Sequence, residues 1–314
     1  MIYSNFIIAV EAVLPITILI LVGLLVKKMH FLTLEEIKHI NKMVFKIFFF
    51  CLLFENMYKA DFDVVFQPRL MVFCLVAIVA IVAIATMIIC PLVKDNRQRG
   101  AMIHAIYRSN FIIIGLPVAA NIFGSDNLAV PSMLITVVIP AYNILAVCVF
   151  ETFRGRTIRL KPVLFGICQN PMIWGCIVGS ILNLCQIDVP ESILKPVYQI
   201  AGATTPLALI LLGASFNMSA VLHNKLSIAL CTMARLIIVP AIILPIAVWM
   251  GYRNIELVSL ITIFASPCAV VGFTMAQQMD SDYALASNCI IATSALSCFT
   301  MMGWIFAGKM LSLF

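Results

Sequence analysis

Apolar residues fill the chain in long runs that short polar connections separate. We count ten runs of about 20 residues, the helix length that a hydrocarbon core of roughly 30 Å requires. The runs cover residues 3–27, 35–57, 68–93, 100–123, 127–150, 162–185, 190–214, 225–250, 255–279 and 282–308. This pattern predicts an all-α membrane protein with ten transmembrane helices. The first run contains Glu11 and Pro15 and lacks a small-residue cleavage site, so we expect it to remain as a helix.

Composition agrees with the hydropathy pattern. The 314 residues are 63% hydrophobic and only 11% charged, and the mean hydropathy is +1.10. Soluble domains are roughly half apolar and a quarter charged. An integral membrane protein is therefore expected, with membrane lipid around it and no separate soluble domain.

The net charge of +6 has a topological explanation. Most of the basic residues in the connections fall in alternate ones, and short loops rich in Lys and Arg stay in the cytoplasm. These residues are Lys27, Lys28, Lys94, Arg97, Arg99, Arg154, Arg156, Arg159, Lys161 and Lys225. We predict a multi-pass protein of the cell membrane, plasma or inner, with both termini on the outer side. No single basic face accumulates, so nucleic acid is not an expected partner.

The eleven cysteines are scattered through the apolar runs. They form no CxxC pair and no histidine cluster lies beside them, so we interpret them as small buried hydrophobes. Neither a disulfide framework, a metal site nor a cofactor is expected.

The two halves of the chain repeat the same residues at a fixed distance. Ser and Gly six residues apart recur at an offset of 157, and Pro and Gly eight apart recur at an offset of 156. The matching pairs are Ser109 and Gly115 with Ser266 and Gly272, and Pro15 and Gly23 with Pro171 and Gly179. We predict five-helix repeats at 1–152 and 162–314, joined by a cytoplasmic loop at 153–161. Because five is odd, the second repeat must be inverted, as in many secondary transporters.

The fourth helix of each repeat carries residues that interrupt a helix. Pro117 leaves the carbonyl of Ile113 without a donor, and Pro267 does the same to Ile263. Unpaired backbone in lipid costs several kcal/mol, so such a break needs cover from protein or a hydrated cavity. We expect the broken fourth and ninth helices to cross at the midplane, where their amide ends favour an anion.

At these same residues the chain resembles a known family. Asn110 stands before Gly115-Leu-Pro117 and Gly124, and four further motifs follow: QNPMIWGCIVGSIL, TTPLALILLGASF, ARLIIVP and SPCAVVGFTMAQQM. Together these residues are similar to the motifs of the auxin efflux carrier family. That family includes the PIN-type auxin exporters of plants and bacterial permeases for malate and malonate. The resemblance covers nearly the whole chain.

The resemblance implies a division of labour between the ten helices. It implies a scaffold domain of helices 1, 2, 6 and 7, a transport domain of helices 3, 4, 5, 8, 9 and 10, and a homodimer. It also implies that Asn110 and the backbone around Pro267 line the substrate site. Distant kin that import bile acids with sodium place an acidic residue at the second break, where Ser266-Pro267-Cys268 offers none. The absence of this acidic residue argues against coupling of transport to sodium. Transport coupled to protons and transport without coupling both stay open.

The candidate substrate site consists of residues at the two breaks. We predict Arg108, Ser109, Asn110, Gly115, Pro117, Ser266, Pro267, Cys268 and Ala269. Arg108 is the residue particular to this chain, because a guanidinium can hold a carboxylate through two parallel hydrogen bonds. A structural ion pair, for example with Glu11, or a side chain that reaches the cytoplasmic interface are the alternatives.

Other ionisable residues within the runs are less decisive. Glu11 is either a proton-sensitive group or a residue in contact with outer water. Lys46 lies four residues after Lys42 and either reaches toward the cytoplasm or responds to charge in the site. His104 relays protons or packs as a hydrogen-bonded histidine. We expect Arg235 to be structural more than a ligand.

These observations predict a secondary carrier for a small organic anion that works by elevator-type alternating access. The anion would be a carboxylate, a dicarboxylate or an auxin-like acid, and the direction of transport is not encoded. The alternative is a ligand-binding sensor or a channel-like facilitator for the same anions. An enzyme is not expected, because four scattered histidines supply neither a nucleophile with its base nor clustered metal ligands.

Overall fold

The computed structural model describes the backbone of residues 2–59, 67–111, 119, 122–123, 129–154, 169–216 and 224–314. Within these ranges it describes the side chains except those of 2–13, 16, 129 and 132. All regular elements in this part of the chain are helices. In the first half they are α1 (Ile2–Lys28), α2 (Leu34–Met43), η1 (Val44–Phe48), α3 (Phe49–Tyr58), α4 (Pro68–Leu92), α5 (Asn96–Tyr107) and α7 (Ala129–Phe153).

The second half continues in the same way. Its helices are α9 (Pro171–Leu184), α10 (Glu191–Ala214), α12 (Lys225–Met233), η3 (Ala234–Ile238), α13 (Val239–Trp249), α14 (Asn254–Ala265), α15 (Val271–Gln278) and α16 (Tyr283–Met310). Two of them, η1 and η3, are π-helical turns inside longer helices, one from Leu34 to Tyr58 and one from Lys225 to Trp249. Such turns are frequent at functional sites.

Five helical segments of the described residues are long and apolar enough to cross a membrane. They are Pro68–Leu92, Met133–Phe153, Glu191–Ala214, Lys225–Trp249 and Tyr283–Met310. Each overlaps one of the apolar runs of the sequence, and α9 and α14 are shorter apolar helices. An all-helical chain with several apolar helices is therefore established, and the full set of ten spans stays a prediction.

Local sequence explains where several helices begin. At the start of α2, the Thr33 hydroxyl accepts the amide hydrogen of Glu36, and the Glu36 carboxylate accepts that of Thr33 at 2.7 Å. This reciprocal capping box satisfies two amides that would otherwise lack partners. Asn170 caps α9 through the amide of Met172 at 2.9 Å, and Pro171 occupies the first turn.

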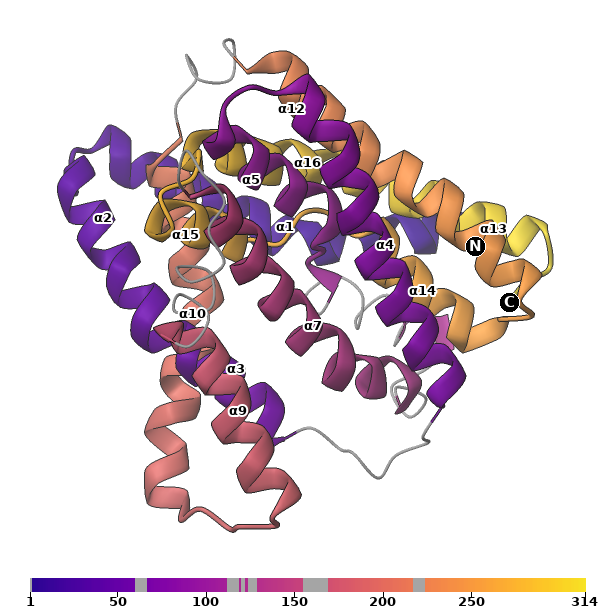
Figure 1. Ribbon diagram of the computed structural model, residues 1–314, viewed down its shortest axis with the longest axis horizontal. Coiled ribbons are helices and arrows are strands. Elements are labelled where there is room, and N and C mark those ends of the chain that lie inside the picture. The colour runs from indigo at the N-terminus through magenta and orange to yellow at the C-terminus, as the bar shows by residue number, and fades with distance from the viewer. Residues whose placement is uncertain are drawn as a thin grey trace.

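Glycines allow two pairs of helices to approach closely. α1 packs on α10, where Gly23 and Gly213 face each other's backbone, and α3 packs on α9. A Cβ added at Gly175 or Gly179 would lie 2.6 Å from the carbonyl oxygen of Phe50 or Phe54. Small residues at such contacts are typical of membrane helices, since packing rather than the hydrophobic effect holds them together. Figure 1 shows α3, α9 and α10 at the lower left, away from α4, α13 and α14 at the right and from α12 at the top.

Candidate functional site

Two extended segments cross where α5 and α14 end. α5 ends at Tyr107 and α14 at Ala265, and after each the chain is extended. Ser109 and Cys268 form an antiparallel β-bridge. Around it, the Asn110 amide donates to the Pro267 carbonyl at 2.9 Å, and the Ala269 amide donates to the Arg108 carbonyl at 3.2 Å. Residues far apart in the sequence thus satisfy each other's backbone groups where helical bonding stops.

The crossing brings most of the predicted site residues together. Arg108, Ser109 and Asn110 lie against Ser266, Pro267, Cys268 and Ala269. Helix resumes at Val271, where α15 begins. Gly115 and Pro117 lie outside the described residues, so their predicted roles stay predictions.

Arg235 holds the crossing from the side of η3. Its side chain is fully buried, and its guanidinium donates to four carbonyl oxygens at 2.6–3.2 Å. The acceptors are Ile106 and Tyr107 at the end of α5, and Ile263 and Ser266 at the end of α14. Carbonyls at helix ends carry partial negative charge, so they compensate the buried cation. The expectation that Arg235 is structural agrees with this geometry.

Arg108 is also buried but has fewer partners among the described residues. One terminal nitrogen donates to Asn143 Oδ1 at 2.6 Å and the other contacts Met275 Sδ at 3.5 Å. Among the described side chains no carboxylate forms a salt bridge with Arg108. The Glu11 side chain lies outside the described residues, so the predicted ion pair between them stays a prediction. Burial of Arg108 beside α7 and α15 argues against a side chain that reaches the aqueous interface.

A cavity of about 120 Å³ lies beside the crossing. Its polar lining comes from the residues Asn56, Arg108, Ser109, Asn110, Tyr142 and Thr205, and its apolar lining includes Phe49, Phe111, Met172, Ala208 and Ala269. α3, α9 and α10 form one wall, and the crossing with α7 forms the other. Arg108 lines the cavity, whereas its side-chain partners Asn143 and Met275 do not.

The side chains of the second segment point in different directions. Ser266 Oγ donates to the Thr262 carbonyl, and Cys268 Sγ lies 3.0 Å from the Ala105 carbonyl oxygen. Neither residue lines the cavity, whereas Ala269, Val270 and Val271 do. On the other segment, Ser109 Oγ is 3.2 Å from the Tyr142 hydroxyl, which also lines the cavity. Ser266 and Cys268 therefore support the segment, and Ala269 faces the space where a ligand would lie.

Of the two other ionisable candidates whose side chains are described, His104 is packed and Lys46 is exposed. The His104 ring stacks on Phe150 with centroids 4.9 Å apart and meets the edge of Tyr107 at 5.6 Å. Behind it lies the backbone of Gly272. This environment favours packing over the proton relay, and the buried Nε2 of His104 has no hydrogen-bond partner among the described residues, unlike the hydrogen-bonded histidine that we expected. Lys46 is exposed on η1 and does not line the cavity.

Sequence reasoning did not select Tyr142 and Asn143, although both contact predicted site residues. Tyr142 bonds Ser109, and Asn143 bonds Arg108 while its amide donates to Cys176 Sγ at 3.4 Å. The signal was the polar pair in PAYNIL, within an otherwise apolar run. Asn56 and Thr205 line the cavity without any pattern that singles them out.

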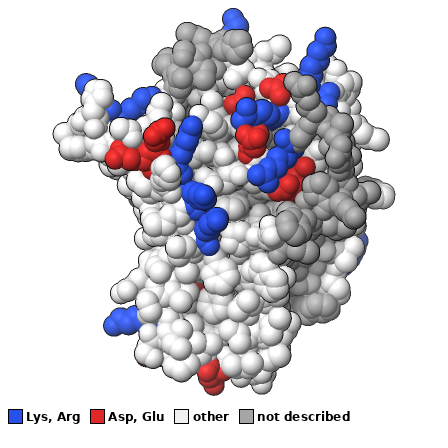
Figure 2. Space-filling model, turned by 60° about the vertical axis from the view of Figure 1, so that its left-hand side comes forward, with Lys and Arg blue, Asp and Glu red and all other residues white. Residues whose placement is uncertain are grey.

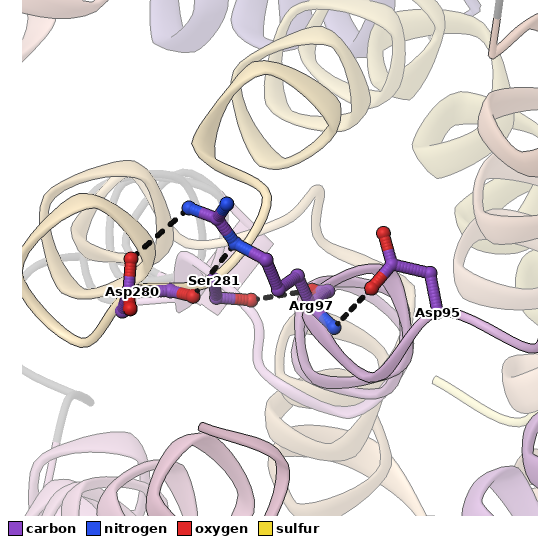
Figure 3. Close-up of polar contacts among 4 residues, drawn as sticks. All are labelled: Asp95, Arg97, Asp280 and Ser281. Carbon is purple, nitrogen blue, oxygen red and sulfur yellow. Dashed lines mark hydrogen bonds and ion pairs between the residues drawn. The ribbon is translucent and has the colours of Figure 1, made fainter. Parts of the chain in front are cut away.

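A polar cluster joins the N-terminal end of α5 to the C-terminal end of α15, on the side away from the cavity. The Arg97 guanidinium donates to the Asp280 carbonyl at 3.0 Å and to its carboxylate at 3.1 Å (Figure 3). The Arg97 carbonyl in turn accepts the Ser281 hydroxyl at 2.6 Å and the Asp282 amide at 3.1 Å, while Asp95 caps the Arg97 amide. An exposed ion pair alone contributes little, but bonds to backbone fix the geometry. The start of α5 is thus bonded to the residues that follow α15, in addition to the backbone bonds at the crossing.

Comparison with known proteins identifies a family of membrane transport proteins. The chain matches the family described as "Membrane transport protein" over residues 8–162 and 156–305. It is 26% identical over 301 residues to an "uncharacterized transporter" of Methanothermobacter thermautotrophicus, covering 94% of this chain and 96% of that protein. It is 23% identical over 310 residues to a second "uncharacterized transporter", of Methanocaldococcus jannaschii, covering 95% and 99%.

The family assignment and the apolar helices point the same way. Matches that run through almost the whole chain and several helices of membrane-spanning length indicate a multi-pass membrane protein. The motifs around Asn110 and Pro267, the helical fold and these matches leave one assignment: the chain belongs to the auxin efflux carrier family of membrane transport proteins.

Proposed function

We propose that the protein is a secondary carrier for a small organic anion with at least one carboxylate. The observation that carries the proposal is Arg108, a buried guanidinium beside the cavity without a carboxylate partner among the described residues. A buried charge is costly unless an opposite charge or several hydrogen bonds compensate it. A carboxylate in the cavity would supply that compensation, and Asn110 and Ser109 would add neutral donors.

The size and lining of the cavity support a small substrate. A space of about 120 Å³ accommodates a few heavy atoms beyond the carboxylate, with Phe49 and Phe111 on the apolar side. Ligand sites commonly combine an apolar lining with a few placed polar groups. Membrane lipid is the surrounding solvent in this proposal, and no cofactor takes part.

Alternating access through inverted repeats is part of the proposal. Gly23 of α1 packs on the Ile210 carbonyl of α10, and Gly179 of α9 packs on the Phe54 carbonyl of α3. Gly179 and Gly23 are 156 residues apart, and so are Ile210 and Phe54. One contact is therefore the repeat of the other, which supports two structural repeats. Their opposite orientation within the membrane follows from the odd number of helices expected in each.

Contacts within each group of helices support the division into two bodies, and α1 also packs on α16 across the two groups. α1, α2, α3, α9 and α10 would form the scaffold, and α4, α5, α7, α12, α13, α14, α15 and α16 the transport domain. α3 packs on α9 and α10 within the first group, and α5 packs on α4 and α7 within the second. The cavity lies between the groups, so movement of one against the other would expose it to each side in turn. The homodimer, the cell membrane and the outer position of both termini remain part of this proposal on the strength of the resemblance and the loop charges.

Transport by purified protein in liposomes tests the function. We expect exchange or accumulation of labelled mono- or dicarboxylates, measured with imposed proton and sodium gradients to reveal coupling. Absence of uptake over a broad panel of organic anions, with properly inserted protein, would refute the carrier. Ligand binding without any transmembrane flux would favour the sensor. A facilitator would instead give flux that only follows the concentration gradient of the anion and is not accelerated by a counter-substrate.

A further inference from the structure

Three lysines form a row on one face of the helix that runs through α2 and η1. Lys38, Lys42 and Lys46 are each four residues apart, and all three are exposed. Residues at this spacing lie above one another on a helix. Figure 2 shows basic side chains that descend from the charged upper part of the molecule toward a lower region that is mostly uncharged. We call Lys38, Lys42 and Lys46 the lysine row.

The row extends into the depth expected of the bilayer. The helix ends at Tyr58, and about 20 residues of helix cross a hydrocarbon core. Counting back from Tyr58 places the core boundary near His39, so that Lys46 lies roughly 10 Å inside it at 1.5 Å per residue. An exposed ammonium at this depth is costly in lipid. Water along this face would remove that cost.

No carboxylate of the described residues neutralises the row. The nearest acidic residues in sequence are Glu35 and Glu36 on the first turn of α2, and the Glu36 carboxylate is taken up by the Thr33 amide and hydroxyl. None of the salt bridges among the described residues involves these lysines. Three exposed cations without an acidic partner among the described residues create a positive potential along this face that attracts anions.

The row lies alongside the seam between α2 and α15 and leads toward the cavity. Asn41, fully buried between Lys38 and Lys42 in the sequence, bonds Thr274 Oγ1 at 2.9 Å and Gln277 Oε1 at 2.5 Å on α15. Phe49, three residues after Lys46, lines the cavity beside the crossing. Anions that pass along this seam when α15 moves away from α2 would meet Lys38, Lys42 and Lys46 in succession.

We propose that the lysine row guides anionic substrate between the cytoplasm and the cavity at the crossing. This inference rests on the proposed carrier function and on the cytoplasmic position of the connection before α2. The row lowers the electrostatic barrier for a carboxylate along a wetted face, and it makes no direct contact with a ligand bound in the cavity. Its effect is larger for a dianion than for a monoanion and weakens as salt screens the lysines.

Charge removal at the row tests its role in transport. In liposomes we expect the double substitution Lys42→Gln and Lys46→Gln to raise the half-saturating concentration of a dicarboxylate on the cytoplasmic side by about three- to tenfold, with the maximal rate preserved. High salt should shrink the difference, and Lys→Arg at both positions should restore the wild-type value. Lys195→Gln on α10, an exposed lysine away from the row, is the control. Unchanged kinetics in the double variant overturn the proposal while leaving the carrier function intact.

Chemical accessibility tests the wetted path without any transport. We expect Lys46→Cys to react with membrane-impermeant thiosulfonate reagents from the cytoplasmic side, and faster with an anionic reagent than with a cationic one. Lys42→Gln should reduce that preference, and the unsubstituted protein measures the reaction of the native cysteines. An unreactive position 46 in lipid vesicles would show a lysine that faces lipid and would overturn the proposal. The labelling result does not depend on transport of a carboxylate. Failure of the proposed role of the lysine row can therefore be distinguished from failure of the proposed carrier function.

Discussion

The Arg235 guanidinium donates a 2.6 Å hydrogen bond to the carbonyl oxygen of Ile263. Pro267 follows four residues later and has no amide hydrogen with which to continue the helical pattern. A side chain from η3 therefore satisfies the carbonyl that the proline leaves without a donor. The same guanidinium serves the end of α5, so one residue stabilises the ends of both helices at the crossing.

Replacing Arg235 should destabilise the fold more than it changes the chemistry of the cavity. In Arg235→Met several buried carbonyls lose their donors at about 1–3 kcal/mol each, so we expect a loss of more than about 3 kcal/mol. Arg235→Lys, which keeps the charge but offers fewer donors, should be intermediate. Thermal unfolding in detergent measures this, with the exposed Arg154→Gln as the control. Equal melting temperatures for all variants would contradict the role of Arg235.

Arg108→Gln should have the opposite effect, with a large loss of anion binding and little change in the stability of the fold. Loss of charge-assisted hydrogen bonds to a carboxylate costs about 1.5–3 kcal/mol, which weakens binding roughly 10- to 100-fold. Stability should be unchanged or higher, because a buried cation without an acidic partner among the described residues is removed. Equilibrium binding of a labelled carboxylate, compared with the melting temperature, separates the two effects. Normal binding by this variant would make Arg108 a structural residue.

Alanine at Gly23 or Gly179 should loosen the helix pairs that they join. A methyl group at Gly179 would lie 2.6 Å from the Phe54 carbonyl oxygen, and one at Gly23 would meet the Ile210 carbonyl. Overpacking of this kind costs about 1–3 kcal/mol. Gly202→Ala and Gly303→Ala are matched controls, since the added carbon would meet no atom of another helix within 4 Å in the described part of the chain. Those two should be neutral or stabilised by up to about 1 kcal/mol in thermal unfolding.

The contact between Asn41 and Thr274 should appear as a coupling energy. Asn41 is fully buried, and its Oδ1 accepts the Thr274 hydroxyl at 2.9 Å. We expect the double variant Asn41→Ala with Thr274→Val to differ from the sum of the single variants by about 0.5–3 kcal/mol. Unfolding of the four proteins in denaturant measures this energy. Additive effects would show that the contact between α2 and α15 does not persist in solution.

His104 and Gly272 offer a test of the packing role. A Cβ at Gly272 would lie 2.6 Å from His104 Cε1, so Gly272→Ala should destabilise the protein. His104→Ala in the same chain should restore part of that loss by making room. Transport by His104→Gln should keep the pH profile of the wild type. A changed profile would assign His104 to proton movement.

The positions of the helices and of the unusual residues follow from the sequence. Apolar runs of membrane length are a local property, so residues 68–93 and 282–308 of the sequence correspond to α4 (Pro68–Leu92) and α16 (Tyr283–Met310). Proline chemistry likewise acts within one turn, which is why Ile263 could be named as the carbonyl without a donor. The motifs around Asn110 and Pro267 were sufficient to identify the family.

The partners of the polar side chains required the tertiary structure. Nothing near Arg235 in sequence indicates that it reaches Ile106, Tyr107, Ile263 and Ser266, because these contacts join helices far apart in the chain. Arg108 was singled out by its charge, but its bond to Asn143 depends on how α5 packs on α7. Hydropathy is one-dimensional and places a residue in a helix, whereas the direction and partner of a side chain depend on which helices pack around it. The sequence by itself therefore determined the family, the apolar helices of the described residues and the candidate site segments. Only the packing decided which cation is held by backbone carbonyls and which remains without an acidic partner among the described residues.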